Sequence, residues 1–186
     1  MRKCLIAIAL FAASLMAGCA GPQYQDNWLR AQFNAPYQLA SGDRLRVIVF
    51  GQDNLSNSFS VDGAGNISMP LIGPIKAQGL TTEELERTVE ARLRNGFLRE
   101  PKVSIEVEAF RPFFVLGEVT TSGQYPFING MTVQNAVAVA GGYTPRGFQG
   151  DGDITRIVNG RSATFAAPLN FPVRPGDTIS VRERFF

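Results

Sequence analysis

The stretch from Val61 to Leu80, VDGAGNISMPLIGPIKAQGL, constrains the fold more than any other part of the sequence. Asp62-Gly63 and Gly65-Asn66 are turn pairs, because glycine accepts positive φ and Asp or Asn side chains hydrogen-bond their own backbone. Two prolines and a glycine then divide Met69 to Ile75 into pieces too short for a helix, since proline lacks an N–H and disfavours helical backbone before it. We therefore predict a hairpin tip followed by a tight, non-helical crossover.

The segments around this stretch alternate or repeat in ways typical of strands and helices. Arg44 to Phe50 and Val103 to Glu108 alternate apolar and polar residues, which predicts two strands with one buried face each. Between them, Thr81 and Glu84 form a capping box, in which each side chain satisfies an amide at the start of a helix. We expect that helix to end at Asn95-Gly96.

The second half of the chain predicts a strand-rich unit with one short helix. Thr132 is a plausible N-cap for a helix that Gly141-Gly142 closes. Asn159-Gly160 is the best short hairpin signal in the chain. Expected strands cover residues 113–119, 125–128, 153–158, 162–166 and 178–182. This order is typical of a β-grasp unit, so the predicted fold class is α+β: a small mixed sheet with one main helix, followed by a β-grasp domain.

A weak internal echo links the two halves. Gly42-Asp43-Arg44-Leu45-Arg46-Val47 parallels Gly176-Asp177-Thr178-Ile179-Ser180-Val181. Six positions do not make a repeat architecture, which needs a sustained period. We interpret the echo as two independent turns, each leading into a strand.

Several of these motifs resemble one known family. YQLASGDRLRVIVFGQDNLS (Tyr37 to Ser56), the stretch from Val61 to Leu80, and PKVSIEVE (Pro101 to Glu108) are similar to the polysaccharide export domain of Wza-like outer-membrane polysaccharide export lipoproteins. VLGEVTTSGQYPFINGMTVQNAVAVAGGYT (Val115 to Thr144) resembles the SLBB domain, a soluble-ligand-binding β-grasp module that follows it in that family. Ser41 and Ser122 stand where family members usually have proline before glycine.

The resemblance implies a division of the chain. We expect a signal peptide at residues 1–18, a lipid-anchored tether at 19–36, an export domain at 37–108 and an SLBB domain at 109–186. Longer relatives carry further SLBB domains and a C-terminal amphipathic helix that forms a pore. This sequence stops just after its last predicted strand, so we expect a short family member without that membrane helix.

The first residues predict secretion and lipidation. Arg2 and Lys3 precede an apolar run that is too short to span a membrane, and Met16-Ala17-Gly18-Cys19 follows. The tetrad resembles a bacterial lipobox, which makes Cys19 the predicted lipid attachment site. An ordinary cleaved signal is the alternative. By family analogy, sorting would be to the outer membrane, with the protein facing the periplasm.

Charge and composition exclude several functions. Without Arg2 and Lys3 the chain has 16 basic and 16 acidic residues, and no basic stripe that would bind nucleic acid. It has no histidine, so histidine-dependent triads and His-rich zinc sites are unavailable, and we expect no cofactor or metal.

Paired carboxylates are the remaining candidates for chemistry, because two acids flanking a sugar bond can hydrolyse it. Helix capping explains Glu83 and Glu84, and a solvated strand face explains Glu106 and Glu108. Asp151 and Asp153 lie in a glycine-rich stretch, residues 147–153, which we interpret as a loop. They are weak candidates for binding a cation or a sugar hydroxyl, although an ordinary connection explains them too.

The expected function is therefore that of a non-enzymatic subunit in polysaccharide export. The resemblance implies a homo-oligomeric ring, forming a periplasmic collar or conduit at the outer membrane for the polymer. Its expected partners are an inner-membrane polysaccharide co-polymerase and a separate outer-membrane pore protein. A monomeric glycan-binding adaptor lipoprotein of the cell envelope is the alternative, and a polysaccharide-modifying enzyme that uses Asp151 or Asp153 is a third possibility.

Overall fold

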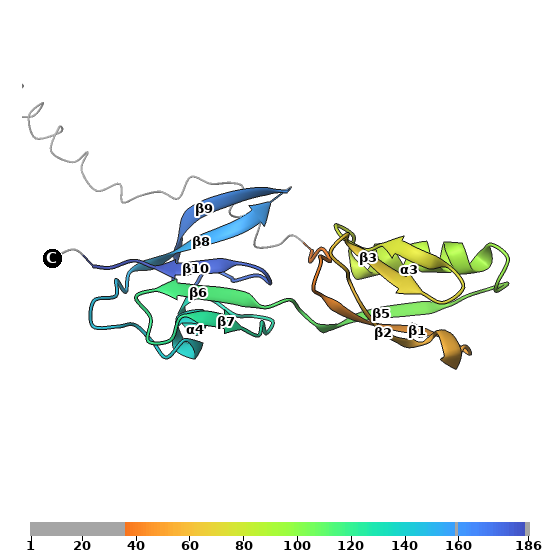
Figure 1. Cartoon of the computed structure of the whole chain (residues 1–186), viewed down its shortest axis with the longest axis horizontal. Helices are drawn as coiled ribbons and strands as arrows, with labels where there is room; N and C mark the ends of the chain where they lie inside the picture. Colours follow the sequence, from red (N-terminus) through yellow and green to blue (C-terminus); the bar gives the residue numbers. More distant parts are fainter. Residues whose placement is uncertain (1–35, 159, 185–186) are drawn as a thin grey trace, which may run out of the picture. The chain divides into compact units, whose positions relative to one another are not determined.

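The computed structural model describes residues 36–158 and 160–184, all within one compact unit. Its elements gather into two sheet regions, residues 36–109 and residues 113–184, with a short connection between them (Figure 1). The predicted α+β fold class is confirmed. In this part of the chain, no helix combines the length and apolarity needed to cross a membrane.

The N-terminal region contains a three-stranded antiparallel sheet in the order β2-β1-β5. Its strands are β1 (Arg44–Val49), β2 (Asn57–Ser60) and β5 (Val103–Ala109), and a single 3-10 turn, η1 (Asp53–Leu55), leads into β2. The inward residues of β1 are fully or almost fully buried, as its alternation predicts.

A second, two-stranded sheet forms from β3 (Asn66–Met69) and β4 (Gly73–Lys76). The turn at Asp62 is present, with its carboxylate accepting the amides of Ala64 and Asn66 at 2.9 Å each. The prediction of a hairpin tip there is wrong, because β2 pairs with β1 and the strand after the turn pairs with β4. The predicted crossover is the actual hairpin, whose inward residues include the buried Ile67 and Ile75.

Helix α3 (Thr82–Arg94) covers these sheets and begins at the predicted capping box. Its buried residues, Leu85, Val89 and Leu93, join the strand residues in one hydrophobic core. Asn95 caps its C-terminus as predicted, and Gly96 follows with a φ of +97°. The helix thereby holds the N-terminal region together.

The C-terminal region is a five-stranded mixed sheet in the order β7-β6-β10-β8-β9. The strands are β6 (Phe113–Gly117), β7 (Gly123–Tyr125), β8 (Asp151–Val158), β9 (Arg161–Pro168) and β10 (Thr178–Val181). The first and last strands of this region, β6 and β10, are parallel neighbours within the sheet, and the other neighbouring pairs are antiparallel. This is the topology of a β-grasp unit. The helix α4 (Val133–Val139) begins at Thr132 as predicted and buries Val133, Ala136 and Val137.

Candidate functional site

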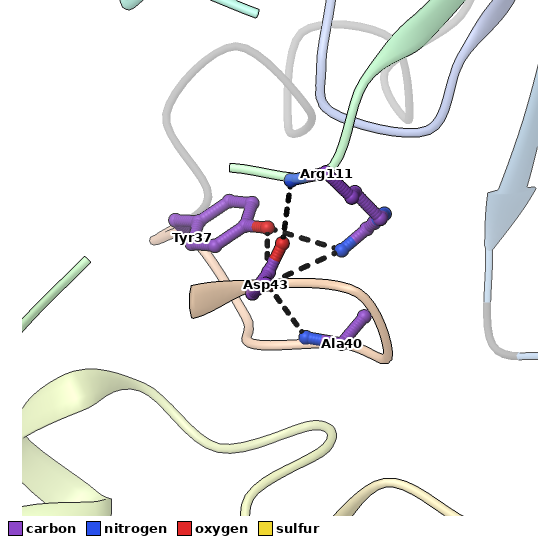
Figure 2. Close-up of polar contacts among 4 residues, drawn as sticks. All are labelled: Tyr37, Ala40, Asp43 and Arg111. Carbon is purple, nitrogen blue, oxygen red and sulfur yellow. Dashed lines mark hydrogen bonds and ion pairs between the residues drawn. The ribbon is translucent and has the colours of Figure 1, made fainter. Parts of the chain in front are cut away.

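The buried carboxylate of Asp43 joins the two sheet regions (Figure 2). Its Oδ2 accepts hydrogen bonds from Tyr37 Oη at 2.6 Å and from the Ala40 amide at 2.8 Å. Its Oδ1 accepts the backbone amide of Arg111 at 3.0 Å, and Arg111 Nη1 lies 3.5 Å from Oδ2. Hydrogen bonds of this kind stabilise a charge that burial alone would disfavour. The carboxylate therefore ties Arg111, in the connection, to the turn that opens β1.

Tyr37 completes this cluster as both donor and acceptor. Its hydroxyl donates to Asp43 and accepts from Arg111 Nη1 at 3.0 Å. Burial, together with the hydrogen bond to the Asp43 carboxylate, raises the pKa of Tyr37 far above its usual value. The phenol therefore stays protonated. Its ring meets the ring of Phe110 edge-on, with 5.0 Å between the centroids.

The Arg111 side chain also lies against a turn of the C-terminal region. The Gly176 amide donates to the Pro112 carbonyl at 3.0 Å. A Cβ atom on Gly176 would lie 2.5 Å from Arg111 Nε, and one on Gly42 would lie 3.4 Å from Arg111 Cβ. Both glycines have positive φ, which L side chains rarely adopt. The two turns that share a sequence pattern thus contact the same arginine.

The two turns are built alike. In each, the aspartate amide donates to the carbonyl three residues earlier at 3.1 Å, and the aspartate is almost fully buried. Asp177 accepts the Arg174 amide at 2.7 Å, as Asp43 accepts that of Ala40. It also forms a buried, two-point ion pair with Arg156, at 2.9 and 2.7 Å. The sequence echo therefore corresponds to a repeated local structure.

A groove of about 700 Å³ opens beside this cluster. The start of α3, the C-terminal half of β5 and the connection form its walls. Its lining contains aromatic and polar side chains, which include Tyr37, Glu83, Arg87, Glu106, Phe110 and Asn129. A concave surface with an aromatic wall and a few polar groups is the usual form of a ligand site.

The predicted acidic pair lies elsewhere. Asp151 and Asp153 both belong to β8 and pair with β9. The predicted strand from Asp153 is confirmed, whereas the interpretation of residues 151–152 as part of a loop is wrong. Arg182 forms an ion pair with Asp151, and its Nε lies 3.4 Å from Asp153 Oδ2. Its guanidinium also lies 5.5 Å from the centroid of the Phe148 ring. Arg182 thus balances charge on the pair, and a ligand-binding role for the two aspartates stays a prediction.

In each of the other two carboxylate pairs, one residue makes a structural contact and the other lines the groove. Glu84 closes the capping box, and its hydrogen bonds with Thr81 hold its pKa below the usual value. Glu108 pairs with Arg44 at 2.9 Å, and hydrogen bonding to Ser58 is the main cause of its lowered pKa. Glu83 and Glu106 line the groove. Across residues 36–158 and 160–184, no three acidic or cysteine side chains form a cluster that could hold a metal. Cys19 lies outside the described residues.

Sequence reasoning missed both the Asp43 cluster and the groove. Asp43 and Arg111 are 68 positions apart, and no periodicity connects them. The repeated Gly-Asp pair was the one sequence feature that pointed to the Asp43 cluster, because a carboxylate in two matching turns suggests a shared structural use. For the groove there was no comparable pattern.

Two family models match the chain in sequence order. Residues 31–108 match "Polysaccharide biosynthesis/export protein", and residues 112–166 match the SLBB domain. The two matches, in this order, confirm the resemblance to Wza-like polysaccharide export proteins that the motifs indicated.

Individual relatives agree with this assignment. The chain is 29% identical over 144 residues to the exopolysaccharide production protein ExoF of Rhizobium meliloti (strain 1021), covering 76% of this chain and 34% of ExoF. It is 27% identical over 138 residues to the polysialic acid transport protein KpsD of Escherichia coli, covering 73% and 24%. It is 26% identical over 185 residues to the EPS I polysaccharide export outer membrane protein EpsA of Ralstonia nicotianae (strain ATCC BAA-1114 / GMI1000), covering 80% and 48%. The matches thus span between a quarter and a half of these relatives.

Proposed function

We propose that this chain is a subunit of a capsular or exopolysaccharide export machine, forming an oligomeric periplasmic collar or conduit at the outer membrane. The ordered pair of export and SLBB domains supports the proposal, as do relatives named for polysaccharide production, transport and export. A single subunit of this size cannot enclose a hydrated polymer. A closed ring of head-to-tail copies can.

The Asp43 cluster is the structural observation that supports a ring-shaped collar. A ring closes only if every copy presents its interfaces at the same angle. The contacts of Asp43 with Tyr37 and Arg111 limit movement at the connection between the export and SLBB domains. A subunit with a fixed connection is suited to such an assembly.

Membrane attachment in this proposal depends on acylation of Cys19. EpsA is named an outer membrane protein, which supports the same location for this chain. We further propose that the collar joins an inner-membrane polysaccharide co-polymerase to a separate outer-membrane pore protein. Its role is passage of the polymer without chemical change, since most of the paired carboxylates have structural partners.

The test is the assembly state of the acylated protein extracted in mild detergent. Native mass spectrometry and electron-microscope class averages should give a ring of several copies with a central opening. Deletion of the gene should stop polymer export, and the wild-type gene should restore it. A monomer at all concentrations, combined with normal export after deletion, would refute the proposal.

The alternative function is a monomeric glycan-binding adaptor lipoprotein. The groove beside Tyr37 favours it, because a ligand site needs no ring. The same mass measurement separates the two functions, since an adaptor would remain a monomer while it binds polymer.

A further inference from the structure

We propose that the groove beside Tyr37 and Phe110 binds a neutral, hydroxyl-rich saccharide segment. The inference rests on the proposed function, because it takes the exported polymer as the source of that segment. It assigns the contact to the export domain, the connection and Asn129 of the SLBB domain, and not to the acidic pair Asp151 and Asp153.

The first argument comes from the free edge of β5. Glu90 Oε1 accepts the Val103 amide at 3.0 Å, and Glu86 Oε1 accepts the Ile105 amide at 2.7 Å. Alternate residues of a strand point their backbone groups to the same side, so the Val107 amide also points away from β1. The residue one turn before Glu86 on α3 is Thr82. Within the described part of the chain, the Thr82 side chain makes no hydrogen bond to the Val107 amide. The Val107 amide and carbonyl are thus left for a ligand in the groove, which Val107 lines.

The second argument excludes a polypeptide strand as the preferred occupant. Arg44 pairs with Ala109 and Leu45 pairs with Val107, so Glu108 forms a bulge directly after the free position. Bulges interrupt the ladder and twist a sheet edge away from further pairing. An added strand would therefore find one free rung, where strand addition needs several. A saccharide requires only separate, local hydrogen bonds.

The side chains around this rung supply those bonds. Glu83, Glu106 and Asn129 are exposed and have no hydrogen-bond partner among residues 36–158 and 160–184. Carboxylates accept hydrogen bonds from sugar hydroxyls, and an amide both donates and accepts them. The half-buried ring of Phe110 adds an apolar wall for the C–H face of a sugar.

Charge decides the kind of saccharide. Glu83, Glu84 and Glu106 outnumber Arg87, so the groove has a negative balance. Like charges repel, which disfavours uronic or sialic acid units. At the N-terminus of α3, the capping box occupies the amides of Thr81 and Glu84, and the Glu83 and Glu84 carboxylates oppose the positive end of the helix dipole. The groove therefore selects a neutral segment.

The experiment titrates the full-length acylated protein in detergent with three probes. These are neutral oligosaccharides cut from the surface polysaccharide of the host cell, maltohexaose, and hexagalacturonate as an acidic probe of the same length as maltohexaose. The Val107 backbone amide and the Asn129 side-chain amide report binding through their NMR shifts. Neutral host fragments should shift both signals, and hexagalacturonate should shift neither.

Variants then test the assigned contacts. Asn129→Ala and Glu106→Gln should each weaken binding of the host fragments about tenfold, because the first removes a groove contact and the second replaces a charged acceptor with a weaker neutral one. Both side chains are exposed, so the fold should be unaffected. Glu100→Gln, at an exposed acid that does not line the groove, is the matched control and should bind like the wild type.

Four results would overturn the inference: no shift at Val107 with any host fragment, unchanged affinity in both variants, tighter binding of hexagalacturonate, or displacement of bound fragments by an extended peptide. Export separates this failure from failure of the proposed function. If deletion of the gene stops export while the groove binds nothing, only the inference falls. If export survives deletion while fragments still bind the groove, only the proposed function falls.

Discussion

The backbone amide of Arg111 binds the carboxylate of Asp43, a fully buried group that lies 68 positions earlier in the chain. The Arg111 side chain turns back to the same site, where its Nη1 reaches Tyr37 Oη. Main chain and side chain of one residue thus fix the connection between the export and SLBB domains. This relationship leads to the first three predictions.

Removal of the Asp43 carboxylate should destabilise the whole described unit. We expect Asp43→Ala to lower the free energy of unfolding by about 3 kcal/mol, because it leaves several donors without their acceptor. Tyr37→Phe, which removes one hydroxyl, should lower it by about 1 kcal/mol. Urea denaturation measures both values. Asp53→Ala, at an exposed aspartate, is the control and should change stability by less than about 0.5 kcal/mol. Equal losses in the two aspartate variants would contradict the assigned role.

A methyl group on Gly176 should displace Arg111. Gly176 and Gly130 have nearly the same φ, +83° and +84°, but only at Gly176 would a Cβ meet another atom, Arg111 Nε at 2.5 Å. Gly130→Ala should therefore cost about 1 kcal/mol for backbone strain alone.

We expect Gly176→Ala to cost about 1 to 2 kcal/mol more than Gly130→Ala, since the arginine must leave its partners. A double-mutant cycle with Arg111→Ala checks this cause. The excess should vanish in the Arg111→Ala background. If it persists there, the clash is not with this side chain.

The raised pKa of Tyr37 predicts a loss of stability in alkali. An unfolded tyrosine loses its proton near pH 10, whereas burial and Asp43 keep the folded Tyr37 protonated. This contribution is fully present below pH 10 and is lost progressively as the pH rises above it. Thermal unfolding between pH 8 and 11 should show a steeper decline for the wild type than for Tyr37→Phe. Parallel curves would show that Tyr37 does not cause the decline.

Acylation at Cys19 has its own test. The wild-type protein should carry lipid on Cys19, detected as added mass on the N-terminal peptide, and should stay with the outer membrane after cell fractionation. Cys19→Ser should lose the added mass and leave the membrane fraction. A free Cys19 thiol in the wild type would refute lipidation and leave an ordinary cleaved signal.

Local chemistry made much of the fold predictable. The capping box at Thr81, the N-cap at Thr132 and the alternation in β1 appear as expected, because neighbouring residues determine them. Pairing between strands that are distant in the sequence was harder to predict. The turn at Asp62 was recognised, yet nothing nearby indicates that the strands on its two sides join different sheets.

The candidate site depends on such distant contacts. Phe110 belongs to the connection and Asn129 to the loop between β7 and α4, and both line the groove with the start of α3. No periodic pattern in the sequence records that these segments meet. The acidic pair, by contrast, was visible in the sequence, but the arginine that balances it lies 31 positions away from Asp151. Glycines around the pair suggested a loop, and pairing with β9 overrode that tendency.

The position of Arg111 also limits how such proteins can be recombined. Its backbone belongs to the connection, while its side chain fits against a glycine of each neighbouring turn. An insertion of even one residue between Phe110 and Pro112 would break both fits at once. Chimaeras between family members should therefore keep three pieces from the same parent: the turn at Gly42, the connection, and the turn at Gly176. The two domains match separate family models, but the residues that form their junction must be exchanged together.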